Sequence, residues 1–171
     1  MFIDCSATFK FDSTGLAGIY IYWKFDEMNS AVILLDFDKD KNNELSKIEQ
    51  IGIYNRIFKN SAKYNFFTHI GYGIELPKIK EVQQFKASIK DKKHLLYSFY
   101  IPLNLSIEKI VNGLMWVYFE DATMFAAFDL KKNLVQVYNK NSDIETSLSF
   151  GKMDYIDKII LTIKKGNPLT H

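Results

Sequence analysis

Residues 1–25 read MFIDCSATFKFDSTGLAGIYIYWKF, and apolar side chains recur at alternate positions through both halves of this segment. An alternation of period two places the apolar side chains on one face of a β-strand. The turn-forming residues Asp12-Ser13-Thr14-Gly15 separate the two alternating halves. We therefore expect a β-hairpin to open the fold. The core-facing positions of its first strand are Met1, Ile3, Cys5, Ala7, Phe9 and Phe11.

The composition indicates one globular domain spanning residues 1–171. Apolar residues make up 47% of the chain and charged residues 25%, which suffices for a sizeable core. The 22 basic and 20 acidic residues give a net charge of +2 without a basic block, so nothing favours a nucleic-acid partner. The apolar runs are far shorter than the ~18 residues that a membrane-spanning helix needs, and we expect no direct insertion into a membrane.

The single cysteine, Cys5, excludes an internal disulfide. It lies on the apolar side of its strand, where a small buried hydrophobic side chain is expected. Trp23, beside Phe25, is expected to be core for the same reason.

The hydrophobic period changes at Asp26, where a helix is expected to begin. Asp26 can cap the free N–H groups of the first turn. The apolar face predicted for this helix consists of Met28, Ala31, Val32 and Leu35. A second helix is predicted from Ser46 to Lys63, with an inner side formed by Ile48, Ile51, Tyr54 and Phe58.

After about Asn65 the pattern returns to strands. Strands are predicted over residues 85–89, 95–103, 115–119, 124–128, 134–138 and 155–163, with a short helix near 106–112. Residues 164–171 are predicted to form a flexible tail. The fold class that follows is α+β: an antiparallel, β-rich, sandwich-like body with a helical hairpin, residues 26–63, inserted between strands.

The loop between the two helices, DKDKNNELSKIE at residues 38–49, carries oxygen-bearing side chains at the spacing of an EF-hand. Calcium takes six to eight oxygens, and a twelve-residue loop supplies them from positions 1, 3, 5, 7, 9 and 12. Position 7 binds through its backbone carbonyl. A count that starts at Asp36 fails, because Lys47 would fall at position 12. The predicted calcium ligands are Asp38, Asp40, Asn42, Glu44, Ser46 and Glu49.

Position 6 of this loop is Asn43, where EF-hands ordinarily have glycine to allow a positive φ. Asparagine tolerates that conformation at a cost of about 1 kcal/mol. Because Lys39, Lys41 and Lys47 also oppose the carboxylates, we expect a modest affinity for Ca²⁺, about 10⁻⁵ to 10⁻³ M. The alternative is an acidic surface loop without an ion, whose carboxylates offset these lysines.

Several separated segments resemble one family of unknown function, described as the periplasmic component of an uncharacterised ABC-type transport system linked with nickel or cobalt. The segments, in order, are MFIDCSATFKFDSTGLAGIYIYWKFDEMNSA, DKDKNNELSKIE, FFTHI and VYFEDATMFAAFDL. The resemblance implies an exported, periplasmic protein that carries an EF-hand, although no leader opens this sequence. It also implies a membrane transporter component as a partner.

Members of that family tend to begin their mature chain with His-Pro-His, just before the segment that matches Met1. This sequence begins after that point. If those imidazoles bind a transition metal, the neighbours that remain here are Asp4 and His69. In the family an acidic residue precedes a proline at one turn, whereas this chain has Asp121-Ala122, so no role is assigned to Asp121.

The histidines also have simpler structural explanations. A lone histidine at the start of a strand, such as His69, is more often a half-buried, hydrogen-bonded ring than a metal ligand. His94 and His171 are expected to be solvated. With no nucleophile beside a base and no glycine-rich phosphate loop, the sequence does not predict an enzyme.

The leading hypothesis is an extracytoplasmic calcium-binding accessory protein of a metal transport system, in which the calcium ion is structural. The alternative is a calcium-stabilised, β-rich interaction or adhesion module without a transport role. An intracellular calcium sensor is disfavoured, because sensor loops usually occur in pairs and this sequence has one such loop.

Overall fold

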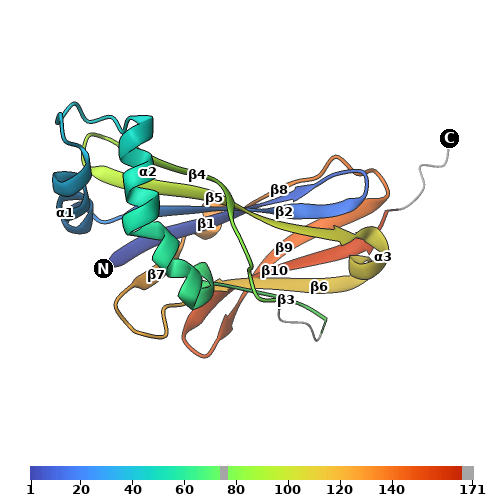
Figure 1. Cartoon of the computed structure of the whole chain (residues 1–171). Helices are drawn as coiled ribbons and strands as arrows, with labels where there is room; N and C mark the ends of the chain where they lie inside the picture. Colours follow the sequence, from blue (N-terminus) through green and yellow to red (C-terminus); the bar gives the residue numbers. More distant parts are fainter. Residues whose placement is uncertain (74–76, 167–171) are drawn as a thin grey trace.

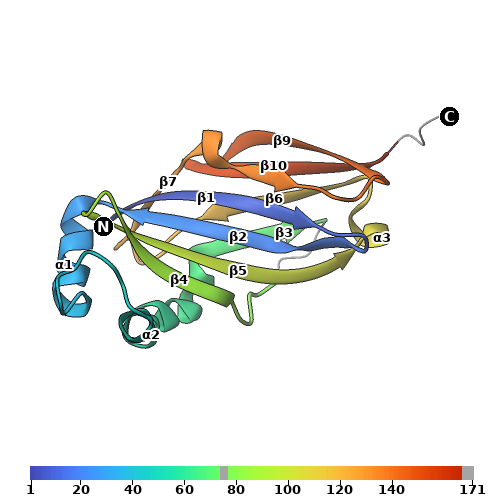
Figure 2. The same ribbon diagram turned by 90° about the horizontal axis from the view of Figure 1, so that it is seen from above.

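The computed structural model describes residues 1–73 and 77–166. Two β-sheets pack face to face, and α1 and α2 lie together at one end of them (Figures 1 and 2). Of the described residues, 50% are in strands and 23% in helices, 3₁₀ segments included, so the predicted α+β class with mostly antiparallel sheets is confirmed. Among the described residues, no helix combines the length and the apolar character needed to cross a bilayer.

The larger sheet has six strands in the order β4-β5-β2-β1-β7, with β8 also paired to β1. The predicted opening hairpin is confirmed: β1 and β2 are antiparallel, and Cys5 lies opposite Trp23. The parallel pairing of β1 with β7 and β8 was not predicted. The strands are β1 (Phe2–Phe11), β2 (Gly15–Phe25), β4 (Gln83–Lys90), β5 (His94–Ser106), β7 (Ala127–Leu130) and β8 (Gln136–Tyr138).

The smaller sheet has four strands in the order β3-β6-β10-β9. One of these strands, β9, has no counterpart among the predicted elements. Because β10 continues through Lys164 and Lys165, the prediction of a tail from residue 164 is wrong for these residues; positions 167–171, including His171, lie outside the described residues. The strands are β3 (Thr68–Tyr72), β6 (Gly113–Phe119), β9 (Ile144–Met153) and β10 (Ile156–Lys165).

The strand predicted over residues 124–128 begins later, at Ala127. The cause is a turn organised by Asp121, whose carboxylate accepts hydrogen bonds from the N–H groups of Thr123 and Ala126. Asp121 therefore has a structural role at this turn.

The helices are α1 (Glu27–Phe37), α2 (Lys47–Arg56) and α3 (Ile107–Ile110), with 3₁₀ segments η1 (Phe58–Phe67) and η2 (Lys132–Leu134). The predicted cap is confirmed, since Asp26 accepts a hydrogen bond from the N–H of Asn29. The second helix ends at Arg56, short of Lys63, because the backbone turns at Ile57 and continues as η1.

The predicted inner face of α1 is wrong. Met28, Val32 and Leu35 are 65–73% exposed, whereas Ser30 and Phe37 are buried and Ile33 and Leu34 pack against the core. The hydroxyl of Ser30 accepts a hydrogen bond from the N–H of Leu95 in β5, which contributes to this orientation.

The predicted inner side of α2 is also wrong in part. Ile48 and Ile51 are exposed, while Ile53 is fully buried. Tyr54 and Phe58, which were also predicted to face inward, do so.

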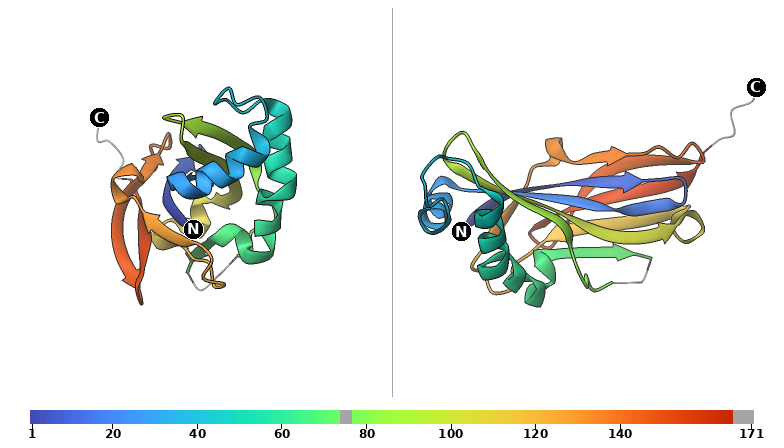
Figure 3. Two further views of the ribbon diagram at one scale, coloured as in Figure 1. Left: turned by 90° about the vertical axis from the view of Figure 1, so that its left-hand side faces the viewer. Right: turned by 45° about the horizontal axis from the view of Figure 1, so that its top comes forward.

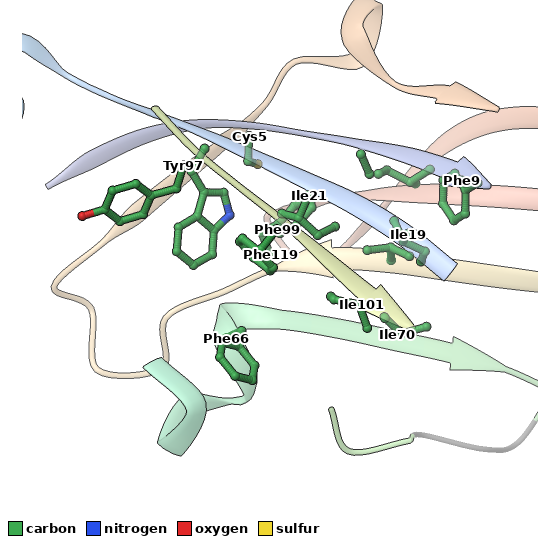
Figure 4. Close-up of a cluster of buried hydrophobic side chains, with 14 of the residues drawn as sticks. Cys5, Phe9, Ile19, Ile21, Phe66, Ile70, Tyr97, Phe99, Ile101 and Phe119 are labelled. Carbon is green, nitrogen blue, oxygen red and sulfur yellow. The ribbon is translucent and has the colours of Figure 1, made fainter. Parts of the chain in front are cut away.

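The core lies between the sheets and is rich in aromatic rings. In Figure 4, Phe99 and Ile101 of the six-stranded sheet lie beside Phe119 and Ile70, respectively, of the four-stranded sheet. Phe58, from η1, extends this core to the helices: its ring centroid lies 5.0 Å from that of Phe99 and 4.4 Å from that of Phe85. Cys5 and Trp23 are buried, as predicted.

Replacing Phe58 by alanine tests whether this ring joins the helices to the sheets. Because Phe58 is fully buried among aromatic rings, Phe58→Ala is expected to lower the free energy of unfolding by about 3–5 kcal/mol. Urea denaturation measures the change. Tyr155→Ala, at an exposed turn position, is the control and should change it by less than about 0.5 kcal/mol. A similar small loss for both variants would contradict the assignment.

Candidate metal centre

Both ends of the acidic loop are anchored in the core. Phe37, the last residue of α1, is buried; it lies beside Gly52 of α2, and the Arg56 guanidinium carbon is 5.1 Å from its ring centroid. Leu45, near the start of α2, is buried. Figure 3 shows α1 and α2 side by side, with the loop joining them at the edge of the molecule. The loop therefore has a fixed position relative to the sheets.

Three predicted ligands converge. Asp38, Asp40 and Glu49 each offer a carboxylate oxygen, and these oxygens lie within 4.8 Å of one another. Calcium binds oxygen at 2.3–2.6 Å, so two oxygens on opposite sides of the ion are separated by about 5 Å at most. The three carboxylates are therefore close enough to be candidate ligands of one ion. The side chain of Glu44 is exposed and outside this cluster, in keeping with a backbone contribution from position 7.

Hydrogen bonds from the loop backbone hold these carboxylates in place. Asp38 Oδ2 accepts from the N–H of Asn43 at 3.2 Å, and Asp40 Oδ1 accepts from the N–H of Asn42 at 3.3 Å. Asn42 Oδ1 in turn accepts from the N–H of Glu44 at 2.7 Å. The loop is thus wrapped around its own oxygen atoms rather than extended into solvent.

Asp38 is the most buried acid of the loop, with 9% of its surface exposed. Its Oδ2 is used by the loop backbone, but its Oδ1 is buried without a hydrogen-bond partner. A buried carboxylate oxygen is costly unless a hydrogen bond or a cation compensates for the lost water. Asp38, whose Oδ1 has no partner, is one of the three residues of the convergent cluster.

Two loop residues adopt positive φ. Asn43 has φ of 63°, as expected for position 6, and Lys41 has φ of 55°. Lysine is less tolerant of this region than asparagine, and its conformation could not be predicted from the calcium pattern.

Glu49 closes the loop and caps α2. Its Oε1 accepts from the N–H of Lys39 at 2.9 Å, and its Oε2 accepts from the N–H and hydroxyl of Ser46. The Ser46 hydroxyl accepts from the N–H of Glu49, which completes a capping box. The bond from the Lys39 N–H, followed by those from Ser46, lowers the pKa of the Glu49 carboxyl. The carboxylate is therefore charged and oriented at neutral pH.

The structure does not bring together the second pair of candidate metal neighbours. Asp4 lies on the outer face of the six-stranded sheet, 3.0 Å from the ammonium of Lys131. His69 lies on the outer face of the other sheet, stacked on Tyr118 with ring centroids 4.6 Å apart. Burial lowers the pKa of His69 and favours its neutral form. These positions match the simpler reading of His69 as a half-buried ring.

The prediction that His94 is solvated is wrong. Its side chain is 15% exposed and its Nε2 lies 3.8 Å from a carboxylate oxygen of Glu27.

Burial raises the pKa of the Cys5 thiol, so this cysteine stays protonated and has the character of a core residue.

Comparison with known proteins gives a family without an assigned activity. A family model described as a protein of unknown function (DUF1007) matches residues 1–150. An uncharacterised 15.5 kDa protein in the trpE 3′ region of Spirochaeta aurantia is 25% identical over 119 residues, which cover 70% of this chain and 77% of that protein.

The hydrogen bonds to Glu49 predict a pH dependence of stability in the presence of a chelator. Since the pKa of Glu49 is lower in the folded state, its contribution to stability is complete above the unfolded pKa of about 4.3 and is lost as the pH falls through the folded pKa. Glu49→Gln should therefore show a shallower acid decline in the free energy of unfolding than the wild type. Glu44→Gln, at an exposed side chain, is the control and should keep the wild-type slope. Equal slopes for all three proteins would refute the prediction.

Proposed function

We propose that this chain, which belongs to the DUF1007 family of proteins of unknown function, binds one calcium ion in the loop of residues 38–49. The observation that carries the proposal is the buried, unpartnered Oδ1 of Asp38, next to carboxylates that lie within reach of a single ion. A divalent cation would compensate the buried charge and also relieve the repulsion between Asp38, Asp40 and Glu49.

The donor set favours calcium over transition metals. The convergent groups are carboxylate oxygens, and hard oxygen donors suit calcium and magnesium, whereas nickel, cobalt and zinc favour nitrogen or sulfur ligands. No histidine or cysteine belongs to the described cluster. Among hard cations, a loop that offers six ligand positions suits calcium, because magnesium demands a smaller octahedral arrangement and retains water.

The ion is proposed to be structural. The loop joins the end of α1 to the start of α2, and its flanking residues Phe37 and Leu45 are in the core. An ion that binds Asp38 and Glu49 would tie the two helices together through the loop. This role needs no large movement, because the carboxylates already converge.

We further propose that the protein works outside the cytoplasm as an accessory component of a metal transport system. Two arguments support this placement: the resemblance of four segments to a transport-linked periplasmic family, and a predicted calcium affinity suited to calcium-rich surroundings. The exposed Met28, Val32 and Leu35 on α1 favour a second candidate function, a calcium-stabilised interaction module without a transport role.

Calorimetric titration separates the two candidate functions. Ca²⁺, Ni²⁺, Co²⁺ and Zn²⁺ should be titrated into this chain and into a longer form with His-Pro-His added before Met1, as in the family that the four segments resemble. Transition-metal binding that requires the added residues supports the transport role. Calcium binding alone in both forms supports the interaction module.

Calcium binding itself is tested by thermal unfolding. At a Ca²⁺ concentration of about 100 times Kd the ion adds about 2.7 kcal/mol to folding, which corresponds to a rise in Tm of about 5–10 °C for a domain of this size. Asp38→Asn should abolish the rise. Asp36→Asn, two residues outside the ligand pattern and exposed, is the matched control and should retain it. A wild-type Tm that ignores both calcium and chelator would sink the proposal.

A further inference from the structure

Strand β9 presents a long edge without a partner in the described part of the chain. All ten of its residues pair with β10, and the register is continuous from Ile144 to Met153. On its other side β9 is the last strand of the sheet. The carbonyl of Ile144 accepts a hydrogen bond from the Asn139 side chain. From Glu145 to Met153, the edge of β9 that faces away from β10 offers unpaired backbone N–H and C=O groups to another strand.

The other sheet edges are protected or short. The N–H of Ala87 in β4 donates to Oε1 of Gln50 in α2, and β4 also contains a register shift between Gln83 and Lys86. β7 and β8 have four and three residues, and β3 has five. Proteins usually protect long edges with bulges, prolines, charges or a covering element. The regular β9 edge contains neither a proline nor a bulge, and its charged residues, Glu145 and Lys152, lie near its two ends.

The sequence of β9 fits a second copy of itself. A two-fold axis perpendicular to the sheet keeps the core sides of both copies together, so core-facing residues must oppose core-facing residues. An axis at Leu148 places Leu148 opposite its own equivalent and Phe150 opposite Thr146 of the second copy. Phe150, 38% exposed at this edge, would gain cover, and aromatic rings opposite β-branched side chains form favourable cross-strand pairs.

The same register brings opposite charges together on the outer face. Glu145 of one copy falls opposite Gly151 of the other, and Gly151 pairs with Lys158 of β10. The Lys158 side chain already leans over Gly151, with its Cε 3.9 Å from the position that a Cβ at Gly151 would occupy. Glu145 and Lys158 have no ion pair among the described residues. Two strand spacings, about 10 Å, are within reach of the two side chains together.

We propose that the chain forms a symmetric dimer through antiparallel pairing of β9 with β9 of a second copy, with Leu148 on the two-fold axis and Glu145 paired to Lys158 across Gly151. The two four-stranded sheets then form one continuous sheet. The occupant is a second copy rather than an unrelated strand because Glu145 falls opposite Gly151 and beside Lys158 of β10, and Phe150 falls opposite Thr146; the one mismatched pair, Lys152 opposite Ile144, lies at the ends of the ladder. The dimer does not depend on calcium binding.

Charge reversal tests the pairing. Analytical ultracentrifugation over a wide range of protein concentration should show a reversible dimer of the full chain. Glu145→Lys and Lys158→Glu should each raise the dimer dissociation constant by about tenfold, because each creates two like-charge contacts. The double variant E145K/K158E should recover the wild-type constant. Unchanged circular dichroism and Tm show that each substitution, at the exposed Glu145 or the half-buried Lys158, leaves the fold intact. A monomeric wild type, or a double variant no better than the single ones, overturns the proposal.

Disulfide trapping tests the register. Leu148→Cys should form a disulfide-linked dimer on addition of an oxidant, since equivalent residues on the axis have Cα atoms close enough to bridge. Ser149→Cys alone should not, because it opposes Ser147 of the second copy. Efficient trapping through Ser149→Cys, or none through Leu148→Cys, excludes this register. The buried Cys5 does not compete.

Discussion

The position of the acidic loop depends on one aromatic cluster, in which Phe58 packs against rings from the sheets. Phe58 touches Trp23 of β2, Phe85 of β4 and Tyr97 and Phe99 of β5. Because η1 follows α2 directly, this packing places α2 along the edge of the six-stranded sheet and leaves the loop at its end. Hydrophobic burial distant from the carboxylates thus determines where they meet.

This arrangement buries part of the Asp38 carboxylate, which is unfavourable. The residue before it, Phe37, is buried, so Asp38 is carried to the boundary of the core. Its neighbours Asp40 and Glu49 satisfy their oxygens with loop N–H groups and Ser46, but Oδ1 of Asp38 has no such bond. An oxygen donor set that is otherwise well hydrogen-bonded, with one buried oxygen left over, is the electrostatic basis of the proposed calcium site.

The sequence predictions that are confirmed rest on local information. Alternation over residues 1–25 predicts the hairpin because a strand face is fixed by period two. The spacing of the loop also brings Asp38, Asp40 and Glu49 together, and their role as ligands stays a prediction. The face of α1 was mispredicted because the helix carries two apolar faces, and tertiary contacts distinguish them: the packing of Ile33, Leu34 and Phe37 and the hydrogen bond of Ser30 with Leu95. Strand β9 does alternate at Ile144, Thr146, Leu148 and Phe150, but its serines and glycine gave a weak strand signal. The burial of Asp38 and the backbone of Lys41 arise from tertiary packing, which spacing does not encode.

Gln50 joins the loop to the sheet through both ends of its amide. Its Nε2 donates to the carbonyl of Leu45 at 2.8 Å, and its Oε1 accepts from the N–H of Ala87 at 3.3 Å. A single side chain thus connects the acidic loop to β4. Coupling between two sites is reciprocal. If an ion in the acidic loop changes the free energy of the Gln50–Ala87 contact, a ligand that displaces Gln50 from Ala87 changes the binding free energy of the ion by the same amount.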